Sequence, residues 1–361
     1  MYDNWHKEFV TNFSHYMKIF NDNMNENYET GIEKLENDIS SFNGRKYCVA
    51  VASATDALKF SLLAHNVGPG DEVLVSNFSW ISSSSCISMV GATPVFCDID
   101  LNSYHITLKE IQKMYSPKVK ALIYTHLFGN MTDTAEIEKF CKEKNIVFIE
   151  DSAQSLGSSL NGRKAGTIGN CSSYSFNSNK VIAGINGGGI FMTDEESKAE
   201  YVKGLRRHGK ISDFEFVGYN SKPYRLNTEI ISFRLSHWRS WQDKRQEIAK
   251  IYNNELNSLP IIMDKAYDPN LDHNYHKYVI RFEDQETRDW VIQALREFDI
   301  RLQIHYDKPL SKNSLYNNIK YRKSKGKNAE IASNTVLSLP INPWLTESEV
   351  KNICSTIQTI L

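Results

Sequence analysis

The chain has 361 residues, of which 41% are hydrophobic and 24% are charged, and this composition excludes intrinsic disorder as its main state. Its 42 basic residues nearly balance 43 acidic ones, so no net positive field is available to hold nucleic acid or an anionic membrane face. The apolar stretches fall far short of the roughly 18 residues that a membrane span needs. The first thirty residues contain no secretory signal. We therefore expect a cytoplasmic protein of about two domains that binds neither nucleic acid nor a membrane.

The cysteines lack the paired spacing that zinc sites and redox dithiols require. We expect six buried thiols and no metal site. The six lie at positions 48, 86, 97, 141, 171 and 354.

The first half of the chain alternates strand and helix patterns. After an amphipathic helix over residues 28–42, residues 46–76 read as strand, helix and strand, and this order recurs up to residue 151. Such repetition predicts a mainly parallel sheet flanked by helices, the α/β class. Residues 161–169 then predict a tight hairpin, and strands near 171–176 and 188–193 add an antiparallel member to the sheet.

The second half predicts a smaller unit. Residues 225–256 contain no Gly or Pro to stop a helix, so we expect one long helix that connects two lobes. A boundary near Ser240 divides the chain into a large α/β domain, residues 1–240, and a small α+β domain, residues 241–361. In the small domain, strands are predicted at 276–282 and 300–306, with helices at 285–298 and from Thr346 onward.

Ligands of open α/β sheets gather where strands end, so polar residues after apolar runs are the first candidates. Residues 52–57 open a helix with small residues, and their free N–H groups and hydroxyl suit a phosphate; a simple helix cap is the alternative. Trp80 follows another strand and could stack on a flat ligand, or lie in the core.

Two further strand ends carry ionisable side chains. Asp151 and Gln154 follow the strand at 146–151, where they could reach a ligand, although Asp151 could instead cap a helix. Lys180 lies between a strand and a glycine-rich stretch, a position that is usually solvated surface. That stretch, GINGGG, lacks the G-x-G-x-x-G spacing of dinucleotide sites, which makes a nicotinamide cofactor a weak hypothesis.

The order of these features resembles the pyridoxal phosphate-dependent sugar aminotransferases of the DegT/DnrJ/EryC1/StrS group. The most specific match is IEDSAQ, followed 29 positions after Asp151 by Lys180. Matching stretches run from about residue 28 to residue 350: ASATDALKFSL, GDEVLVSNFSW, GATPVFCDID, THLFGNMTD, IEDSAQSLGS, YSFNSNK, LRRHG, VGYN, IHYDKPL and LSLPINPWLTESEV.

The resemblance implies fold type I, the aspartate aminotransferase-like fold, with pyridoxal 5'-phosphate as cofactor. It makes Lys180 the residue that binds the cofactor covalently, places Asp151 at the pyridine nitrogen and Gln154 near the phenolic oxygen. A lysine amine can attach the cofactor and shuttle protons, and a carboxylate favours the electron-withdrawing pyridinium form. The remaining implied cofactor contacts are Ala54, Thr55, Trp80, Ser175 and Asn220. Asn220 matches a residue that the neighbouring subunit lends, so a homodimer with shared active sites is implied.

The chain departs from the family pattern around the substrate. Gly187 stands where the family has a glutamate. The arginine that follows the family's asparagine closely comes only at Arg225, and residues 230–232 stand in place of the family's Q-A-A. A sister branch that performs dehydration has histidine at the lysine position, and Lys180 argues against that branch.

The leading hypothesis is an aminotransferase that moves nitrogen from an amino acid, L-glutamate, to a nucleotide-linked keto sugar, a 3- or 4-keto-6-deoxyhexose, for surface glycans such as lipopolysaccharide O-antigen. Two alternatives are a regulatory or structural protein that binds the cofactor without transferring nitrogen, and an aminotransferase for a keto cyclitol. Substrate contacts expected from the resemblance are His305 and Tyr306, and a diphosphate could meet Arg206, Arg207 and His208. Ion pairs with helix carboxylates and a hydrogen-bonded strand histidine are the structural alternatives.

Overall fold

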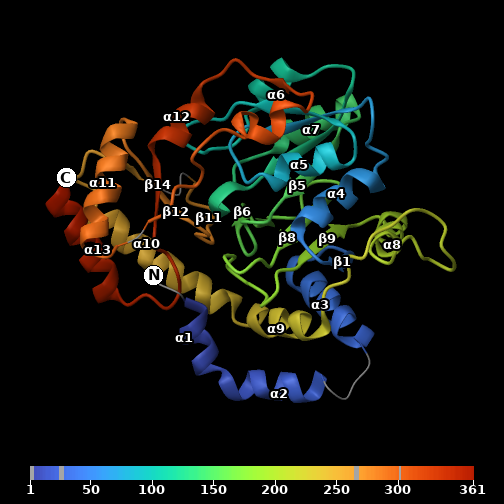
Figure 1. The fold of residues 1–361 in the computed structure, drawn as a ribbon, viewed down its shortest axis with the longest axis horizontal. Helices are drawn as coiled ribbons and strands as arrows, with labels where there is room; N and C mark the ends of the chain where they lie inside the picture. Colours follow the sequence, from blue (N-terminus) through green and yellow to red (C-terminus); the bar gives the residue numbers. More distant parts are fainter. Residues whose placement is uncertain (1–3, 24–27, 264–267, 301) are drawn as a thin grey trace.

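The computed structural model describes residues 4–23, 28–263, 268–300 and 302–361. Its centre is an eight-stranded sheet (Figure 1), in which five neighbouring pairs are parallel and β9 alone runs antiparallel to both of its neighbours. The predicted mainly parallel α/β sheet with one antiparallel member is therefore confirmed. In spatial order the strands are β1 (Tyr47–Val51), β9 (Gly189–Thr193), β8 (Cys171–Ser175), β5 (Val147–Asp151), β4 (Val119–Thr125), β2 (Glu72–Ser76), β3 (Thr93–Cys97) and β13 (Arg322–Lys323).

Helices cover both faces of this sheet because its strands are apolar on both sides. In β1, for example, Val49 and Val51 enter the core on one face, and Cys48 and Ala50 enter the core on the other. The first face carries α4 (Ala54–Ala64), α5 (Ser82–Met89) and α8 (Glu196–Leu205). The second carries α3 (Tyr28–Asn43), α6 (Leu108–Met114) and α7 (Ala135–Lys144), and α9 (Arg225–Leu235) packs on α3.

The C-terminal elements enclose a second core. An antiparallel sheet of β10 (Ile262–Met263), β12 (Tyr278–Arg281) and β14 (Val336–Leu339) packs against α10 (Trp238–Glu255), α11 (Gln285–Glu297) and α13 (Glu347–Ile360). Thr346 caps α13 in a capping box, as its position predicts. Between the two cores lie α12 (Asn328–Thr335) and η1 (Leu127–Gly129), and η2 (Leu310–Lys312), η3 (Ser314–Asn317) and β13 return to the large sheet.

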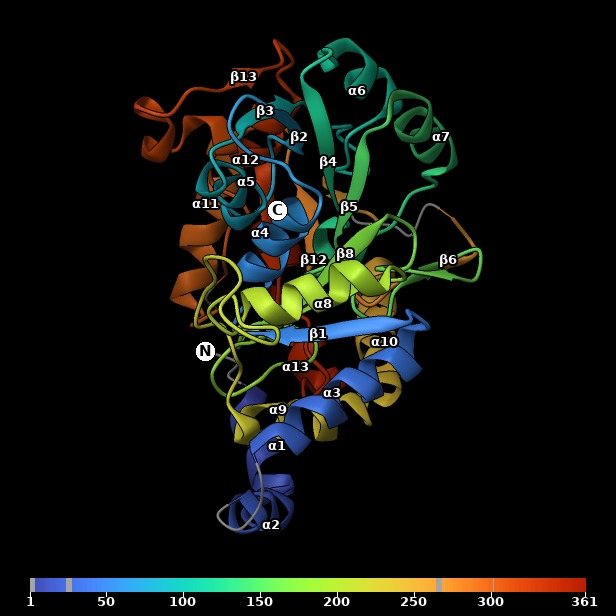
Figure 2. The same ribbon diagram turned by 90° about the vertical axis from the view of Figure 1, so that its right-hand side faces the viewer.

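Two smaller features complete the described chain. The predicted hairpin forms as β6 (Ser159–Leu160) and β7 (Arg163–Lys164), and β11 (Leu271–Asp272) pairs with it. The helices α1 (Asn4–Thr11) and α2 (Phe13–Asn23) project from the body as an N-terminal arm in both views (Figures 1 and 2).

All six cysteines are buried and unpaired. Within the described ranges no helix has the length and apolar character of a membrane span.

Two predicted elements differ from the structure. The single helix over residues 225–256 is wrong, because α9 ends at Leu235 and α10 begins at Trp238. At the break, the Ser236 hydroxyl donates to the Phe233 carbonyl oxygen, and the His237 N–H bonds the carbonyl three residues back instead of four. The strand at 300–306 is also wrong: Arg301 lies outside the described residues, and only an isolated bridge joins Gln303 to Ser338.

Candidate active site

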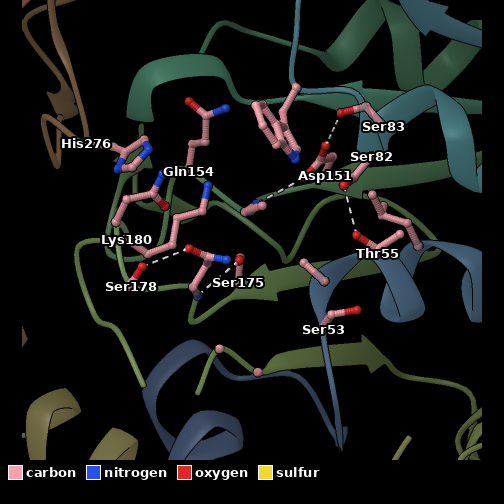
Figure 3. A pocket seen from close by; sticks show the side chains of 18 of the residues that line it. Ser53, Thr55, Ser82, Ser83, Asp151, Gln154, Ser175, Ser178, Lys180 and His276 are labelled. Carbon is pink, nitrogen blue, oxygen red and sulfur yellow. Dashed lines mark hydrogen bonds between the residues drawn. The ribbon is translucent and has the colours of Figure 1, made fainter. Parts of the chain in front are cut away.

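A cavity of about 550 Å³ opens where β5 and β8 end and α4 begins (Figure 3). This is the edge of a parallel sheet at which ligands are expected to bind. The cavity brings together seven of the predicted cofactor residues, which are Ala54, Thr55, Trp80, Asp151, Gln154, Ser175 and Lys180, and both His305 and Tyr306. Its lining also includes Ser53, Ser82, Ser83, His276 and Lys277.

The first turn of α4 forms an anion cradle in the cavity wall. Ser53 is extended and caps the helix, because its Oγ accepts from the Asp56 N–H at 3.1 Å. The helix-cap interpretation is therefore correct for Ser53, yet Ala54 and Thr55, in the first turn of α4 where amide groups lack intrahelical partners, line the cavity. Gly189 lets β9 approach this turn, since a Cβ at that position would lie 2.4 Å from the Ala54 nitrogen. The start of a helix lined by small residues is a place where a phosphate can bind.

Asp151 ends β5 with its carboxylate in the cavity wall. Its Oδ2 accepts hydrogen bonds from the Ser83 hydroxyl at 2.6 Å and the Thr125 hydroxyl at 3.3 Å. These bonds hold the buried carboxylate in one orientation. Turns, and not a helix, come between Asp151 and β6, so the interpretation of this residue as a helix cap is wrong.

The Gln154 side chain forms hydrogen bonds with both Phe128 and Tyr306. Its Oε1 accepts from the Phe128 N–H at 3.0 Å, and its Nε2 donates to the Tyr306 hydroxyl at 3.0 Å. The amide is thereby held in one orientation. Tyr306 also lies 6.1 Å from the ring centre of Trp80, whose side chain is 57% exposed and forms a wall of the cavity. The alternative that places Trp80 in the core is wrong.

Lys180 follows β8 after a short loop and points its amine into the cavity (Figure 3). Burial lowers the pKa of this amine from its ordinary value to about 8, although the Asp151 carboxylate acts in the opposite direction. A useful fraction of the amine is therefore neutral near pH 7. Neutral amine is the form that attacks a carbonyl or accepts a proton, so a solvated surface lysine is the wrong interpretation.

The expected substrate contacts divide into two groups. His305 lines the cavity and bonds the Ser338 hydroxyl at 2.9 Å, while burial lowers its pKa to about 3 and keeps the ring neutral. Arg206 does not face the cavity, because its guanidinium donates to Glu36 of α3 and to the Ala50 carbonyl oxygen. Its expected role at a diphosphate is wrong, and the ion pair with a helix carboxylate is confirmed.

Arg207, His208 and Asn220 lie in an exposed segment outside this cavity. Their backbone is ordered by an antiparallel bridge between Arg207 and Asn220. The structure describes one chain, so the role of Asn220 in a neighbouring subunit stays a prediction.

Comparison with known proteins identifies the family. The family model described as "DegT/DnrJ/EryC1/StrS aminotransferase family" matches residues 13–358. The chain belongs to this family. Membership confirms the expected pyridoxal phosphate-dependent aminotransferase and its fold type I architecture.

Several members of the DegT/DnrJ/EryC1/StrS family resemble the chain over most of its length. A dTDP-3-amino-3,6-dideoxy-alpha-D-galactopyranose transaminase from Aneurinibacillus thermoaerophilus is 31% identical and covers 95% of both chains. A pleiotropic regulatory protein from Geobacillus stearothermophilus is 30% identical over 90% of this chain and 88% of its own. The crystal structure of S. venezuelae DesV in complex with a ketimine intermediate matches with a TM-score of 0.93 and 26% identity, over 98% of this chain and 96% of DesV.

Several residues of the site were not predicted from the sequence. Ser83 orients Asp151, His276 and Lys277 line the cavity, and Asn227 holds the glycine loop through its bonds to Asn186 and Gly187. Ser83 stands in a run of four serines, and nothing in that run distinguishes one hydroxyl from another. The sequence did contain a signal for Lys277. This lysine stands directly before the apolar run that forms β12, and a charged residue at the end of a strand is a candidate for a site.

Proposed function

We propose that the protein transfers an amino group from L-glutamate to a nucleotide-linked keto sugar, a 3- or 4-keto-6-deoxyhexose, in the cytoplasm. The product would serve surface glycan assembly, such as lipopolysaccharide O-antigen. One observation carries the proposal: Lys180, Asp151 and Gln154 face one cavity whose rim is the anion cradle of α4. Relatives named as transaminases of dTDP-linked and UDP-linked sugars support the acceptor class.

The cavity fits pyridoxal 5'-phosphate by its donor set. The start of α4, with Thr55, would hold the phosphate together with Ser175, and Trp80 would cover one face of the ring. Asp151 would face the ring nitrogen and keep it protonated. When bound, this cofactor supplies an electron-withdrawing ring and a carbon that carries the amino group between the two substrates.

The chain's own residues then supply proton transfer and orientation. The neutral Nζ of Lys180 takes the α proton of the amino donor and holds it for return, which is general acid–base catalysis by a positioned amine. Ser83 and Thr125 hold the Asp151 carboxylate in place throughout, so no reorganisation is needed during the reaction. The same Nζ delivers a proton to the sugar carbon in the second half of the reaction.

The nucleotide part of the acceptor fits a neighbouring groove. This open groove of about 590 Å³ shares Trp80, His305 and Tyr306 with the cavity and continues along α11. A sugar ketone placed beside Lys180 would leave its diphosphate and nucleoside in the direction of this groove. His305 and Tyr306 lie at the junction and would contact the sugar.

A regulatory protein without transaminase activity is the second candidate, because a relative at 30% identity carries the name of a regulatory protein. The retained Lys180 and Asp151 favour the enzyme, since binding alone needs no proton shuttle. An aminotransferase for a keto cyclitol is the third candidate, and it would leave the groove along α11 without a nucleotide.

Two measurements test the proposal. Borohydride reduction of the protein loaded with pyridoxal phosphate, followed by mass spectrometry, should place the label on Lys180; a label on Lys277 or elsewhere would refute the assignment. Adding L-glutamate should bleach the yellow band of the bound cofactor, and keto sugars with and without a nucleotide should restore it at different rates. A loaded protein whose spectrum glutamate does not change would be a binder and not an enzyme.

A further inference from the structure

A second lysine faces the cavity beside Lys180. Lys277 lies directly before β12, where its backbone N–H donates to the Phe128 carbonyl oxygen at 3.2 Å. The residue is half-buried, and Lys180 and Lys277 are the two Lys or Arg side chains among the residues that line the cavity. Residue 277 is thus fixed at the end of a strand with its side chain at the reaction site.

Lys277 has no anionic partner among the described residues. No ion pair or hydrogen bond of its amine is found there, whereas the amine of Lys59 in α4 pairs with Asp56 at 2.8 Å. Burial and then the positive charges of Lys180 and Arg245 lower its pKa to about 8, so the amine remains largely protonated at pH 7. A half-buried cation without a counter-ion indicates that an anionic ligand completes the site.

The other polar groups of the cavity do not supply that anion. The Asp151 carboxylate is engaged by Ser83 and Thr125, and His276 and His305 are neutral at pH 7 because burial lowers their pKa values. The cofactor phosphate has its own cradle at α4, and the cofactor engages the Lys180 amine. In the loaded protein Lys277 is therefore the cation of the cavity lining that remains to meet a substrate.

We propose that Lys277 is a specificity-determining residue whose ammonium binds a carboxylate of the amino donor. The inference rests on the proposed function, because the donor must bring its amino group to Lys180 and an α-amino acid carries a carboxylate one carbon away. An ammonium on the wall of the same cavity is available to that carboxylate. The cation then selects amino acids over simple amines as donors.

The test measures binding of glutarate, a dicarboxylate without an amino group, to the protein loaded with pyridoxal phosphate. Calorimetric titration should show that Lys277→Gln weakens glutarate binding about 10- to 100-fold, the effect of losing one charge-assisted hydrogen bond. Lys277→Arg, which keeps the charge, should stay within a few-fold of the unmodified protein. Lys308→Gln is the matched control, because Lys308 is exposed and lines neither the cavity nor the groove.

Three results would overturn the inference. They are unchanged glutarate affinity in Lys277→Gln, an equal loss in Lys308→Gln, and a loss of cofactor affinity as large as the loss of glutarate affinity, which would assign Lys277 to the cofactor. Failure of the proposed function looks different. In that case glutarate still binds through Lys277, but L-glutamate leaves the cofactor spectrum of the unmodified protein unchanged.

Discussion

The reactivity of Lys180 depends on the balance between burial and the charge of Asp151. Burial lowers the pKa of the amine to about 8 and Asp151 raises it. Because only the neutral amine attacks an aldehyde, the rate at which the cofactor-free protein captures pyridoxal phosphate should rise about tenfold per pH unit below pH 8 and level off above it. Stopped-flow absorbance between pH 6 and pH 10 measures this rate. A rate that is flat from pH 6 to pH 8 would contradict the assignment.

Asp151→Asn tests the other side of that balance. The substitution removes the negative charge that raises the pKa of Lys180, so the midpoint of the same pH profile should move to lower pH. Turnover should nevertheless fall by at least about 100-fold, because a neutral amide cannot keep the ring nitrogen protonated. An unchanged midpoint would show that the carboxylate does not act on the amine.

Ser83 acts on catalysis through Asp151. Ser83→Ala removes the 2.6 Å hydrogen bond to the carboxylate, which Thr125 only partly replaces at 3.3 Å, so we expect kcat to fall about tenfold with little change in thermal stability. Ser84→Ala on the same helix is the control, since that hydroxyl bonds Ile81 and Tyr316 and not Asp151. Equal kcat values for the two variants would remove Ser83 from the list of positioning residues.

Residues that follow apolar strands could be predicted from the sequence, because a strand end is visible in the pattern and its place in the sheet follows from βαβ order. Asp151, Gln154 and the turn before α4 were found in this way, and the family resemblance gave Lys180 its role. Arg206 was misplaced because a sequence does not show that Glu36, 170 positions away, lies opposite its guanidinium. Tertiary pairing of this kind is decided by packing and leaves no local signal.

At the scale of elements, the two wrong predictions lie where hydrogen bonds and packing of side chains compete with the regular backbone hydrogen bonds of a helix or strand. The absence of Gly and Pro between residues 225 and 256 predicted one helix, but hydrogen bonds from Ser236 and His237 to the preceding turn interrupt it. The segment at 302–306 has the apolar alternation of a strand, yet Tyr306 packs on Phe78 and bonds Gln154 instead of continuing the sheet. The βαβ core was predictable because periodicity and buried packing agree there.

The glycine loop after Lys180 is held by α9. The Asn227 side chain accepts from the Asn186 N–H at 3.2 Å and donates to the Gly187 carbonyl oxygen at 2.9 Å. Asn227→Ala should therefore raise the amide hydrogen exchange of residues 184–190 about tenfold and weaken cofactor binding. Thr228→Val is the control, because the Thr228 hydroxyl donates to the Arg225 carbonyl oxygen of its own helix and not to the loop. Unaltered exchange in Asn227→Ala would mean that the loop is held by its backbone alone.

At the scale of the whole molecule, the segment around Asn220 presents apolar side chains to solvent. Val217 is 90% exposed, and Phe214 and Tyr224 are also exposed. Several exposed apolar side chains in one segment are typical of a surface that another protein covers. This agrees with the prediction that the segment enters the site of a second copy, where Asn220 would reach the cofactor phosphate.

Mixing two inactive variants tests that proposal. Lys180→Ala removes the amine of its own site, and Asn220→Ala would weaken the phosphate site of the neighbouring subunit. If sites are shared, a mixed dimer has one intact site and one doubly altered site, so random exchange of equal amounts should restore about a quarter of the normal activity at limiting cofactor. Mixing Lys180→Ala with Asp151→Asn is the control, since both changes lie in the same protomer's half of the site and no intact site can form. No recovery with Asn220→Ala would argue that each chain builds its site alone, whereas recovery in the control would mean that the gain in activity does not report a shared Asn220.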